Sequence, residues 1–361
     1  MNNTYLIIAL GSIIVIFVLA VVGVNTFSGI EVPDAGEGPV SRRSEGIFIS
    51  EDGGREFEKS LEFSGDSRNA FELPIQEIKQ FGEDGQTLFA STANDGLFRS
   101  TDRGDTWNQI FEGPTITSFA FDSNDRNIVY VAAMYEGRAR VYKTFNGNGP
   151  YREMYVEPRS TAQIVSLDFD PTQANTLYMA LSNGVVLKTT NGGESWFFLD
   201  TIPEPIVDLH LHTTDQNRLY VLTTTGMYRS DNQGEDFEKL RVAIPGNIYT
   251  GVSVTAMDVN PQDGNRVILT GVDVVIQSQD GGETWEDIEI ITPESNANIS
   301  AVTYSPNNRN KIQYISGSVF YSSSDGGRSW RTTQLDIPSR RTVSSLLISR
   351  ENDDIIVLGV R

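Results

Sequence analysis

The octapeptide Ser278–Trp285, SQDGGETW, recurs along the chain, and we call each copy a box. The box starts are 50, 44, 45, 41, 48 and 45 residues apart, about the length of one four-stranded blade of a β-propeller. The spacing therefore predicts a seven-bladed β-propeller. In chain order the boxes are Ser50–Phe57, Ser100–Trp107, the degenerate Thr144–Tyr151, Thr189–Trp196, Ser230–Phe237, Ser278–Trp285 and Ser323–Trp330.

Within each box, small polar residues, glycine and an aromatic residue occupy fixed positions. A Ser, Asp or Asn side chain that begins a tight turn accepts hydrogen bonds from backbone N–H groups, and glycine supplies the positive-φ positions. The aromatic ring enters the next strand, where we expect it to pack between blades. The box residues are therefore expected to stabilise the fold. They are Ser50, Asp52, Gly54, Phe57, Ser100, Asp102, Gly104, Trp107, Asn191, Gly193, Trp196, Ser230, Asn232, Gly234, Phe237, Ser278, Asp280, Gly282, Trp285, Ser323, Asp325, Gly327 and Trp330.

A second pattern precedes the boxes: an apolar strand, an Asx turn and another strand, as in Ile164–Ala180 (IVSLDFDPTQANTLYMA). An Asn follows the first turn residue after five positions. Each blade is therefore predicted to have four antiparallel strands, with A and B joined by the Asx turn and C and D joined by the box. The turn pairs are Asp122/Asn127, Asp170/Asn175, His212/Asn217, Asn260/Asn265 and Ser305/Asn310.

The two ends of the repeat region complement each other. Val343–Val360 reads as A and B strands with no box after it, whereas the first box has only Gly46–Ile49 before it. Joined, these ends match the internal sequence LYMALSN followed by GVVLKTTNGGESW. The seventh blade is therefore expected to be shared between N- and C-terminal strands, which closes the ring without an unpaired edge.

The N-terminal segment has a different composition. After a short tail (1–4), Tyr5–Val24 is an almost wholly apolar run long enough to cross roughly 30 Å of bilayer as a helix. We expect a retained transmembrane helix, with a cleaved signal peptide as the alternative. Residues 25–44 are predicted to be a flexible linker and 45–361 the propeller. The short tail and the acidic domain favour a single-pass cell-membrane protein with its propeller outside the cytoplasm.

Composition excludes several function classes. The formal net charge of −20 argues against nucleic acid as a partner, because phosphate binding requires basic residues. The chain has no cysteine, which excludes disulfides, thiolate metal sites and a cysteine nucleophile. A phosphate-binding glycine loop, a nucleophile elbow and an H-E-x-x-H motif are also absent, so we predict no catalytic residues and no cofactor.

The two histidines, His210 and His212, share a strand with Asp208 at the i, i+2 spacing that brings metal ligands together. Aligning the blades argues against a metal site. His212 occupies the first position of an Asx turn, and His210 falls in a column with Asp168, Asp258 and Thr303.

Variation specific to this chain is expected on the face that carries the B–C and D–A connections, because the repeated turns occupy the other face. Tyr and Arg are enriched where proteins bind proteins, and these connections contain several in an otherwise acidic chain. They form a candidate partner-binding patch, with ordinary solvated loops as the alternative. The patch residues are Tyr135, Arg138, Arg140, Arg159, Tyr249, Arg340 and Arg341.

The boxes resemble the Asp box (BNR repeat) of sialidases, sortilin-type receptors, xyloglucanases and photosystem II assembly factors. The assembly factors are the most similar in architecture, because they pair one seven-bladed propeller with an N-terminal export or anchoring segment. This resemblance covers about Glu45 to Arg361. It implies a non-enzymatic helper that docks on a subunit of a membrane complex, or on an exported protein, through an arginine-bearing face.

The alternative function is a glycoside hydrolase or a carbohydrate-binding protein. Sialidases with Asp boxes have six blades, an arginine triad and an R-I-P motif, and xyloglucanases place the sugar between two propellers. The repeats here predict one propeller of seven blades, without that motif. A single propeller can still hold two carboxylates roughly 5–10 Å apart, as glycoside hydrolysis requires. A sortilin-like receptor would have ten blades and a Cys-rich module.

Overall fold

The computed structural model describes residues 46–60, 62–63, 73–113, 115–243, 254–272, 274–291, 299–337 and 341–361. The predicted tail, transmembrane helix and linker lie outside these ranges, as do Tyr249 and Arg340. Within the described ranges, no helix is both long and apolar enough to span a bilayer.

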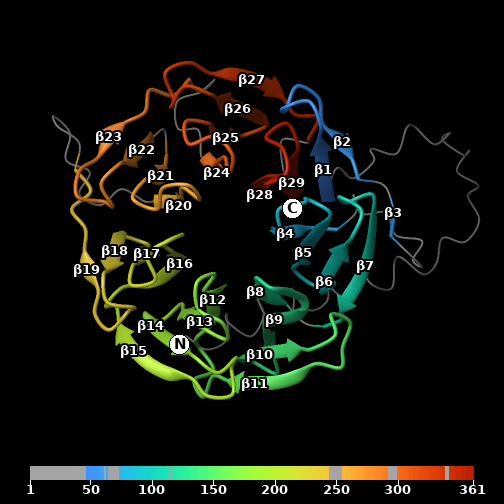
Figure 1. The fold of residues 1–361 in the computed structure, drawn as a ribbon, viewed down its shortest axis with the longest axis vertical. Helices are drawn as coiled ribbons and strands as arrows, with labels where there is room; N and C mark the ends of the chain where they lie inside the picture. Colours follow the sequence, from blue (N-terminus) through green and yellow to red (C-terminus); the bar gives the residue numbers. More distant parts are fainter. Residues whose placement is uncertain are drawn as a thin grey trace, which may run out of the picture. The chain divides into compact units, whose positions relative to one another are not determined.

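Seven antiparallel sheets follow one another around a ring (Figure 1), which confirms the predicted all-β propeller. The innermost strand of each blade comes first in the following list. Blade 1 contains β4 (Ile75–Phe81), β5 (Thr87–Thr92), β6 (Leu97–Ser100) and β7 (Thr106–Phe111); blade 2 contains β8 (Ile116–Asp122), β9 (Asp125–Tyr135), β10 (Arg138–Thr144) and β11 (Arg152–Val156); blade 3 contains β12 (Ile164–Phe169), β13 (Leu177–Leu181), β14 (Val185–Thr189) and β15 (Phe197–Thr201); blade 4 contains β16 (Ile206–Leu211), β17 (Leu219–Thr223), β18 (Gly226–Ser230) and β19 (Glu238–Lys239).

The remaining blades continue the ring, and the last one is completed by the first two strands of the described chain. Blade 5 contains β20 (Val254–Val259), β21 (Val267–Gly271), β22 (Val274–Ser278) and β23 (Glu286–Asp287); blade 6 contains β24 (Ile299–Tyr304), β25 (Ile312–Ser316), β26 (Val319–Ser323) and β27 (Arg331–Gln334); blade 7 contains β28 (Val343–Ile348), β29 (Ile356–Val360), β1 (Gly46–Ser50) and β2 (Glu58–Lys59).

The predicted closure of the ring is confirmed. Strand β1 pairs antiparallel with β29 from Gly46↔Val360 to Ser50↔Ile356, and the blue and red strands lie side by side in Figure 1. Blade 1 departs from the predicted four strands, because the two-residue strand β3 (Glu62–Phe63) pairs in parallel with its outer strand β7.

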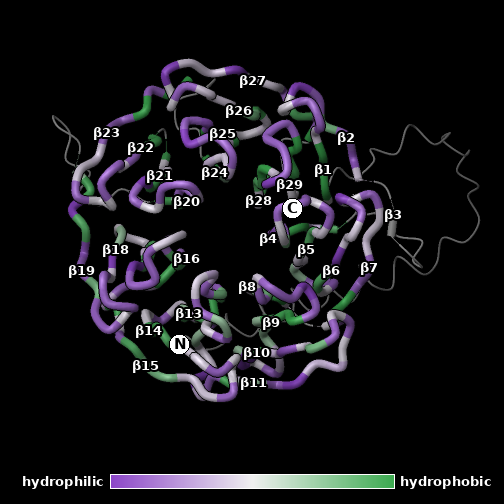
Figure 2. The backbone as a smooth tube through the Cα atoms, viewed as in Figure 1, coloured by the Kyte–Doolittle hydropathy of each residue, from purple (hydrophilic) through white to green (hydrophobic). Residues whose placement is uncertain are grey.

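The core lies between blades. The second strand of blades 3 to 7 is buried along its whole length, because neighbouring blades cover both of its faces. Aromatic and branched side chains fill the space between blades, as where Phe89 of β5 packs near Phe119 of β8. Figure 2 shows hydrophobic colour along strands such as β1, whereas the connecting turns are mostly hydrophilic.

The boxes form the predicted turns. In Ser278–Trp285 the Ser278 hydroxyl accepts the Gly282 N–H at 2.8 Å and donates to Asp280 at 2.8 Å. Asp280 then accepts the Thr284 N–H at 2.9 Å, and Trp285 is buried. The same bonds from the first residue recur at Ser50, Ser100, Thr189, Ser230 and Ser323.

In blades 3 to 6 the box also contacts the Asx turn of its own blade. Gly192 N–H donates to the Asn175 carbonyl, Gly281 to Asn265 and Gly326 to Asn310, each at 2.8 Å. The boxes and the Asx turns therefore share one face of the ring, which we call the box face. The B–C and D–A connections lie at the opposite ends of the strands, on the loop face.

Every innermost strand carries a β-bulge at its second residue, where the pairing register shifts. A bulge turns two successive side chains toward the same side of a sheet. The end of each innermost strand nearest the loop face therefore presents an additional side chain toward the ring axis. The bulged residues are Gln76, Thr117, Val165, Val207, Thr255, Ser300 and Ser344.

Candidate functional site

Charged side chains gather at the ring axis on the third and fifth residues of the innermost strands. The third-residue tier is Glu77, Ser118, Ser166, Asp208, Ala256, Ala301 and Ser345, and the fifth-residue tier is Lys79, Ala120, Asp168, His210, Asp258, Thr303 and Leu347. We call the six ionisable members the axial cluster: Glu77, Lys79, Asp168, Asp208, His210 and Asp258.

Each cation of the axial cluster lies beside a carboxylate. The Lys79 ammonium is 2.9 Å from a Glu77 oxygen and 3.9 Å from an Asp168 oxygen. It also donates to the Phe119 carbonyl at 2.7 Å. The His210 Nε2 lies 3.0 Å from an Asp208 oxygen. Strands of blades 1, 3 and 4 therefore bring these five groups together at the axis, where Asp168 interacts electrostatically with both Lys79 and His210.

Some residues of these two tiers also form hydrogen bonds with the backbone of the next blade. Asp258 accepts the Val259 N–H at 2.9 Å and the Tyr304 N–H of blade 6 at 2.7 Å. The Ser118 hydroxyl accepts the Leu167 N–H of blade 3 at 3.1 Å in the same manner. These side chains satisfy backbone donors that no strand pairs, so they stabilise the contact between neighbouring blades.

The electrostatic environment raises the pKa values of some groups of the axial cluster and lowers that of Asp208. Burial raises the pKa of Glu77, Asp168 and Asp258 above the usual range. Burial also opposes charge on His210, but the Asp208 carboxylate and its hydrogen bond outweigh burial and raise the pKa of His210 to about 9. The His210 imidazolium in turn outweighs burial at Asp208 and lowers the pKa of that carboxyl.

A hollow of about 460 Å³ opens over the axial cluster at the loop face. Glu77 and Asp208 line it, together with bulged residues of blades 1 to 4. Among the described residues, its lining contains no aromatic side chain. The residues that line it are Gln76, Glu77, Thr115, Ile116, Thr117, Ser118, Gln163, Ile164, Val165, Ser166, Val207, Asp208 and Arg361.

The hollow is suited to hydrogen bonding with an extended chain. Amide and hydroxyl groups from Gln76, Thr117 and Gln163 offer both donors and acceptors. The two carboxylates beneath them already have protein partners, because Glu77 pairs with Lys79 and Asp208 with His210.

The described residues contain no group of three His, Asp or Glu side chains arranged to hold a metal ion. His212 takes the Asx-turn role predicted for it, since its Nδ1 accepts the N–H groups of Thr214 and Asp215 at 3.2 and 2.9 Å. That nitrogen must be unprotonated to accept, and burial lowers the pKa of His212.

The described residues of the candidate partner-binding patch lie at two separate places in the ring, blade 2 and blade 7. Tyr135 and Arg138 are exposed at the β9–β10 hairpin, and Arg140 lies over the Tyr135 ring at 5.1 Å. Arg140 also pairs with Glu136 and Glu153, at 3.1 and 2.6 Å, so its charge is matched within blade 2. Arg159 is exposed after β11, whereas Arg341 precedes β28 in blade 7. Their role in binding stays a prediction.

Sequence reasoning missed the two blade 1 members of the axial cluster, Glu77 and Lys79. Blade 1 lacks the repeated Asx-turn pattern, so the sequence alone does not align its innermost strand with the others. The column of Asp168, His210 and Asp258 was visible in the sequence. Extending that column to Ile75–Phe81 would have identified Lys79.

No protein-family model matches the chain. A stretch of 113 residues is 26% identical to Vacuolar protein sorting/targeting protein 10 of Colletotrichum graminicola, covering 31% of this chain and 7% of that protein. Among solved structures, the GH74 xyloglucanase from Xanthomonas campestris gives a TM-score of 0.65 at 17% identity, covering 80% of this chain and 51% of that enzyme.

In two further solved structures, the match to this chain covers nearly the whole length of the solved chain. YCF48 from Cyanidioschyzon merolae gives a TM-score of 0.60 at 12% identity, covering 80% of this chain and 96% of that one. A structure of YCF48 bound to D1 peptide gives 0.59 at 17% identity, covering 80% and 94%. The chain therefore has the seven-bladed β-propeller fold found in GH74 enzymes and in YCF48.

Proposed function

We propose that this chain is a non-enzymatic binding module that docks on a protein partner through its loop face. In this proposal residues 5–24 anchor it in a membrane, and the propeller lies on the extracytoplasmic side. The partner is a membrane-complex subunit or an exported protein. The anchor is supported by the apolar run Tyr5–Val24, and the docking face by the hollow at the ring axis.

The observation that carries the proposal is the lining of that hollow. Backbone edges and short polar side chains of four blades converge there, and Val165 and Val207 add small apolar surfaces. A polypeptide offers both hydrogen-bonding groups and apolar side chains, so it can use all of this surface. The described part of the lining offers no aromatic ring for a sugar to stack on, which disfavours a sugar as the ligand.

The solved structures support a peptide partner by analogy. One propeller similar to this chain was captured as YCF48 bound to D1 peptide. A seven-bladed ring of this size can therefore bind a peptide. At 17% identity, no residue of that interface is assigned to this chain.

Photo-crosslinking tests the docking face. A photoreactive amino acid replaces Val207, which is 39% exposed and lines the hollow, in the full chain expressed in its native membrane. The matched control replaces Ser324, exposed on the box face. We expect a discrete crosslinked protein from position 207 and none from 324. Equal products from both positions, or none from 207, would refute docking at the loop face.

The alternative function, a glycoside hydrolase, has one observation in its favour. Glu77 and Asp208 both line the hollow, and their pKa values move in opposite directions, as those of an acid and a base do in such enzymes. Hydrolysis of xyloglucan and sialosides by the wild type, but not by Glu77→Gln or Asp208→Asn, would establish this alternative. It would also overturn the non-enzymatic proposal.

A further inference from the structure

We call the residue directly before a box the latch residue. In blades 2, 3 and 4 this residue is a lysine or an arginine, and its side chain reaches the box of the next blade. Lys143 donates to the Gly192 carbonyl at 3.1 Å, and Arg229 donates to the Gly281 carbonyl at 2.9 Å. Lys188 donates to the Gln233 side chain at 2.6 Å. A cation of one blade therefore fills the space beside the fourth box position of the next.

The contact between blades 5 and 6 lacks this cation. Its latch residue is Gln277, and the sixth position of the next box is Arg328. In the preceding contact the equivalent residues are Arg229 and Glu283, which pair at 2.8 Å. The basic residue at this contact is thus in the box and not at the latch position, and it forms no ion pair with a described carboxylate.

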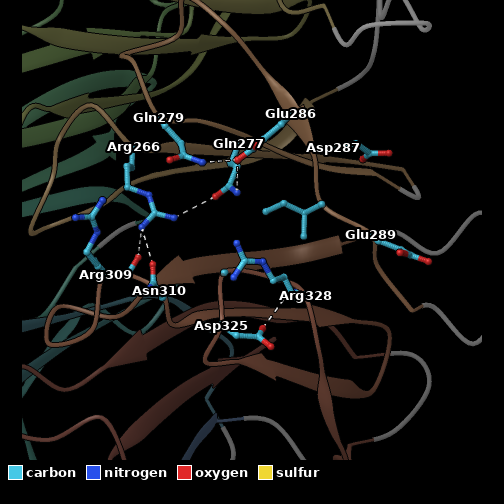
Figure 3. Close-up of a pocket in the computed structure, with 13 residues that line it drawn as sticks. Arg266, Gln277, Gln279, Glu286, Asp287, Glu289, Arg309, Asn310, Asp325 and Arg328 are labelled. Carbon is cyan, nitrogen blue, oxygen red and sulfur yellow. Dashed lines mark hydrogen bonds between the residues drawn. The ribbon is translucent and has the colours of Figure 1, made fainter.

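A cavity of about 540 Å³ occupies this place (Figure 3). A Cβ atom at Gly326, the fourth box position of blade 6, would meet nothing within 4 Å. At its counterparts a Cβ would come within 2.8 Å of a basic side chain, which is the latch residue Lys143 at Gly192 and Arg218 at Gly281. The cavity is therefore a space that a lysine or arginine fills at both of those contacts.

Three guanidinium groups line the cavity, and no described carboxylate oxygen lies closer than 3.8 Å to any of them. Arg266 is 4% exposed, and it bonds only amide and main-chain oxygens, including Gln277 Oε1 and Asn310 Oδ1 at 3.4 Å each. Its Nε has no acceptor. Arg309 lies 3.8 Å from Asp263, and no described carboxylate lies within 4 Å of Arg328. Figure 3 shows Arg328 extending from its box toward Gln277.

The nearest carboxylates are occupied by neutral donors. Asp325 accepts the Arg328 and Ser329 N–H groups at 3.0 Å each and the Ser329 hydroxyl at 2.7 Å. Glu286 accepts the side-chain amide of Gln277 at 2.7 Å. Asp287 and Glu289 lie at the opposite end of the cavity from Arg309 (Figure 3). Cationic donors thus remain available on one side.

We propose that this cavity binds a carboxylate group, held by Arg328 and Arg309 at its entrance with Arg266 behind them. A guanidinium matches a carboxylate in a bidentate pair, and the volume lies within the range of ligand pockets. The surrounding acidic residues and the net charge of −20 disfavour a doubly charged phosphate. The carboxylate belongs either to a Glu or Asp of a protein partner or to a small free acid.

Arginine Nε–H resonances in ¹H–¹⁵N NMR spectra of the propeller test the proposal. The probes are the blocked tripeptide acetyl-Gly-Glu-Gly-amide and free glutarate, and acetyl-Gly-Gln-Gly-amide is the neutral control. We expect saturable shifts of the Arg328 and Arg266 signals with a carboxylate probe. Tighter binding of the tripeptide indicates a protein source, and tighter binding of glutarate a free acid. No shift with either probe overturns the proposal.

Two variants test the site itself. Arg328→Gln, at an exposed position, is expected to weaken binding about tenfold or more, because a charged hydrogen-bond donor is lost. The double variant Gln277→Arg/Arg328→Glu recreates the Arg229–Glu283 pair and should abolish binding by filling the cavity. Arg350→Gln, an exposed arginine of blade 7, is the control and should bind as the wild type does. Unchanged binding in the double variant would also overturn the proposal.

Discussion

His210 and His212 lie two residues apart in opposite electrostatic environments. Asp208, Asp168 and Asp258 surround His210 and favour its protonated form, whereas His212 accepts two backbone N–H groups and must stay neutral. We expect His210 to titrate near pH 9 and His212 below its usual pKa. An NMR titration of the two imidazoles checks this, with His212→Asn used to assign the signals. Equal pKa values would contradict the structure.

The raised pKa of His210 also affects stability. A group whose pKa is higher in the folded chain stabilises it fully below the unfolded pKa, about 6.5 for histidine, and loses that contribution as pH rises through about 9. Asp208 lies beside His210 on the same strand, and the ionisable groups that face it from other blades are Glu77, Lys79, Asp168 and Asp258. We expect the urea midpoint to fall between pH 6.5 and 9.5, and to fall less in His210→Gln. An equal decrease in both proteins would exclude His210 as the cause.

The aspartate of a box holds its turn through several donors at once. Asp280 accepts the Thr284 N–H at 2.9 Å, the Thr284 hydroxyl at 2.6 Å and the Ser278 hydroxyl at 2.8 Å. Asp280→Ala is expected to lower the free energy of unfolding by about 1–3 kcal/mol, because these donors lose their acceptor. Urea denaturation measures the loss. Ser324→Ala, at the exposed second position of the next box, should change it by less than about 0.5 kcal/mol.

At the scale of elements, the latch residues connect strand C of one blade to the box of the next. Arg229 binds two groups across that boundary, the Gly281 carbonyl and Glu283, and it pairs with Asp231 in its own blade. Arg229→Met keeps much of the side-chain volume but removes these bonds. We expect a loss of about 1–3 kcal/mol in urea denaturation, whereas Arg138→Met, at an exposed hairpin position, should cost little. Similar losses in both variants would argue against the latch.

The box turns could be predicted from the sequence because a turn depends on residues a few positions apart. The bulges of the innermost strands could not, because a bulge is a property of two paired strands and their register. Gln76 and Val207 occupy equivalent bulges yet share no chemical feature. The latch residues did carry a signal: Arg99, Lys143, Lys188 and Arg229 each stand directly before a box. This series of basic residues ends at Gln277, which lines the cavity between blades 5 and 6.

At the scale of the whole molecule, the ring depends on the strand that completes blade 7. Phe48 of β1 is 4% exposed and packs with residues of blades 6 and 7. Phe48→Ala is expected to lower stability by about 3–5 kcal/mol through loss of buried surface and a cavity. Phe197→Ala, at a 56% exposed ring on blade 3, is the control. Equal thermal denaturation midpoints for the two variants would show that ring closure contributes little to the stability of the fold.

The ring itself was predictable because both of its ends repeat a known part of the internal pattern. The charge network at its axis was only partly predictable. Asp168, His210 and Asp258 aligned by their distance from the turns, but their meeting with Lys79 depends on closure, which brings blade 1 opposite blades 3 to 5. No local pattern contains that information, since it arises from the seven-fold arrangement of strands.

The pairing of β1 with β29 sets an order of events during protein synthesis. At about 5–20 residues per second, the roughly 300 residues between these strands take roughly 15–60 s to be made. Throughout that interval the apolar side chains of Ile47 and Phe48 lack the strand that covers them. Ring closure is therefore coupled to the arrival of the final strand, and a ribosome that stalls before Ile356–Val360 leaves an exposed strand edge available to chaperones and proteases.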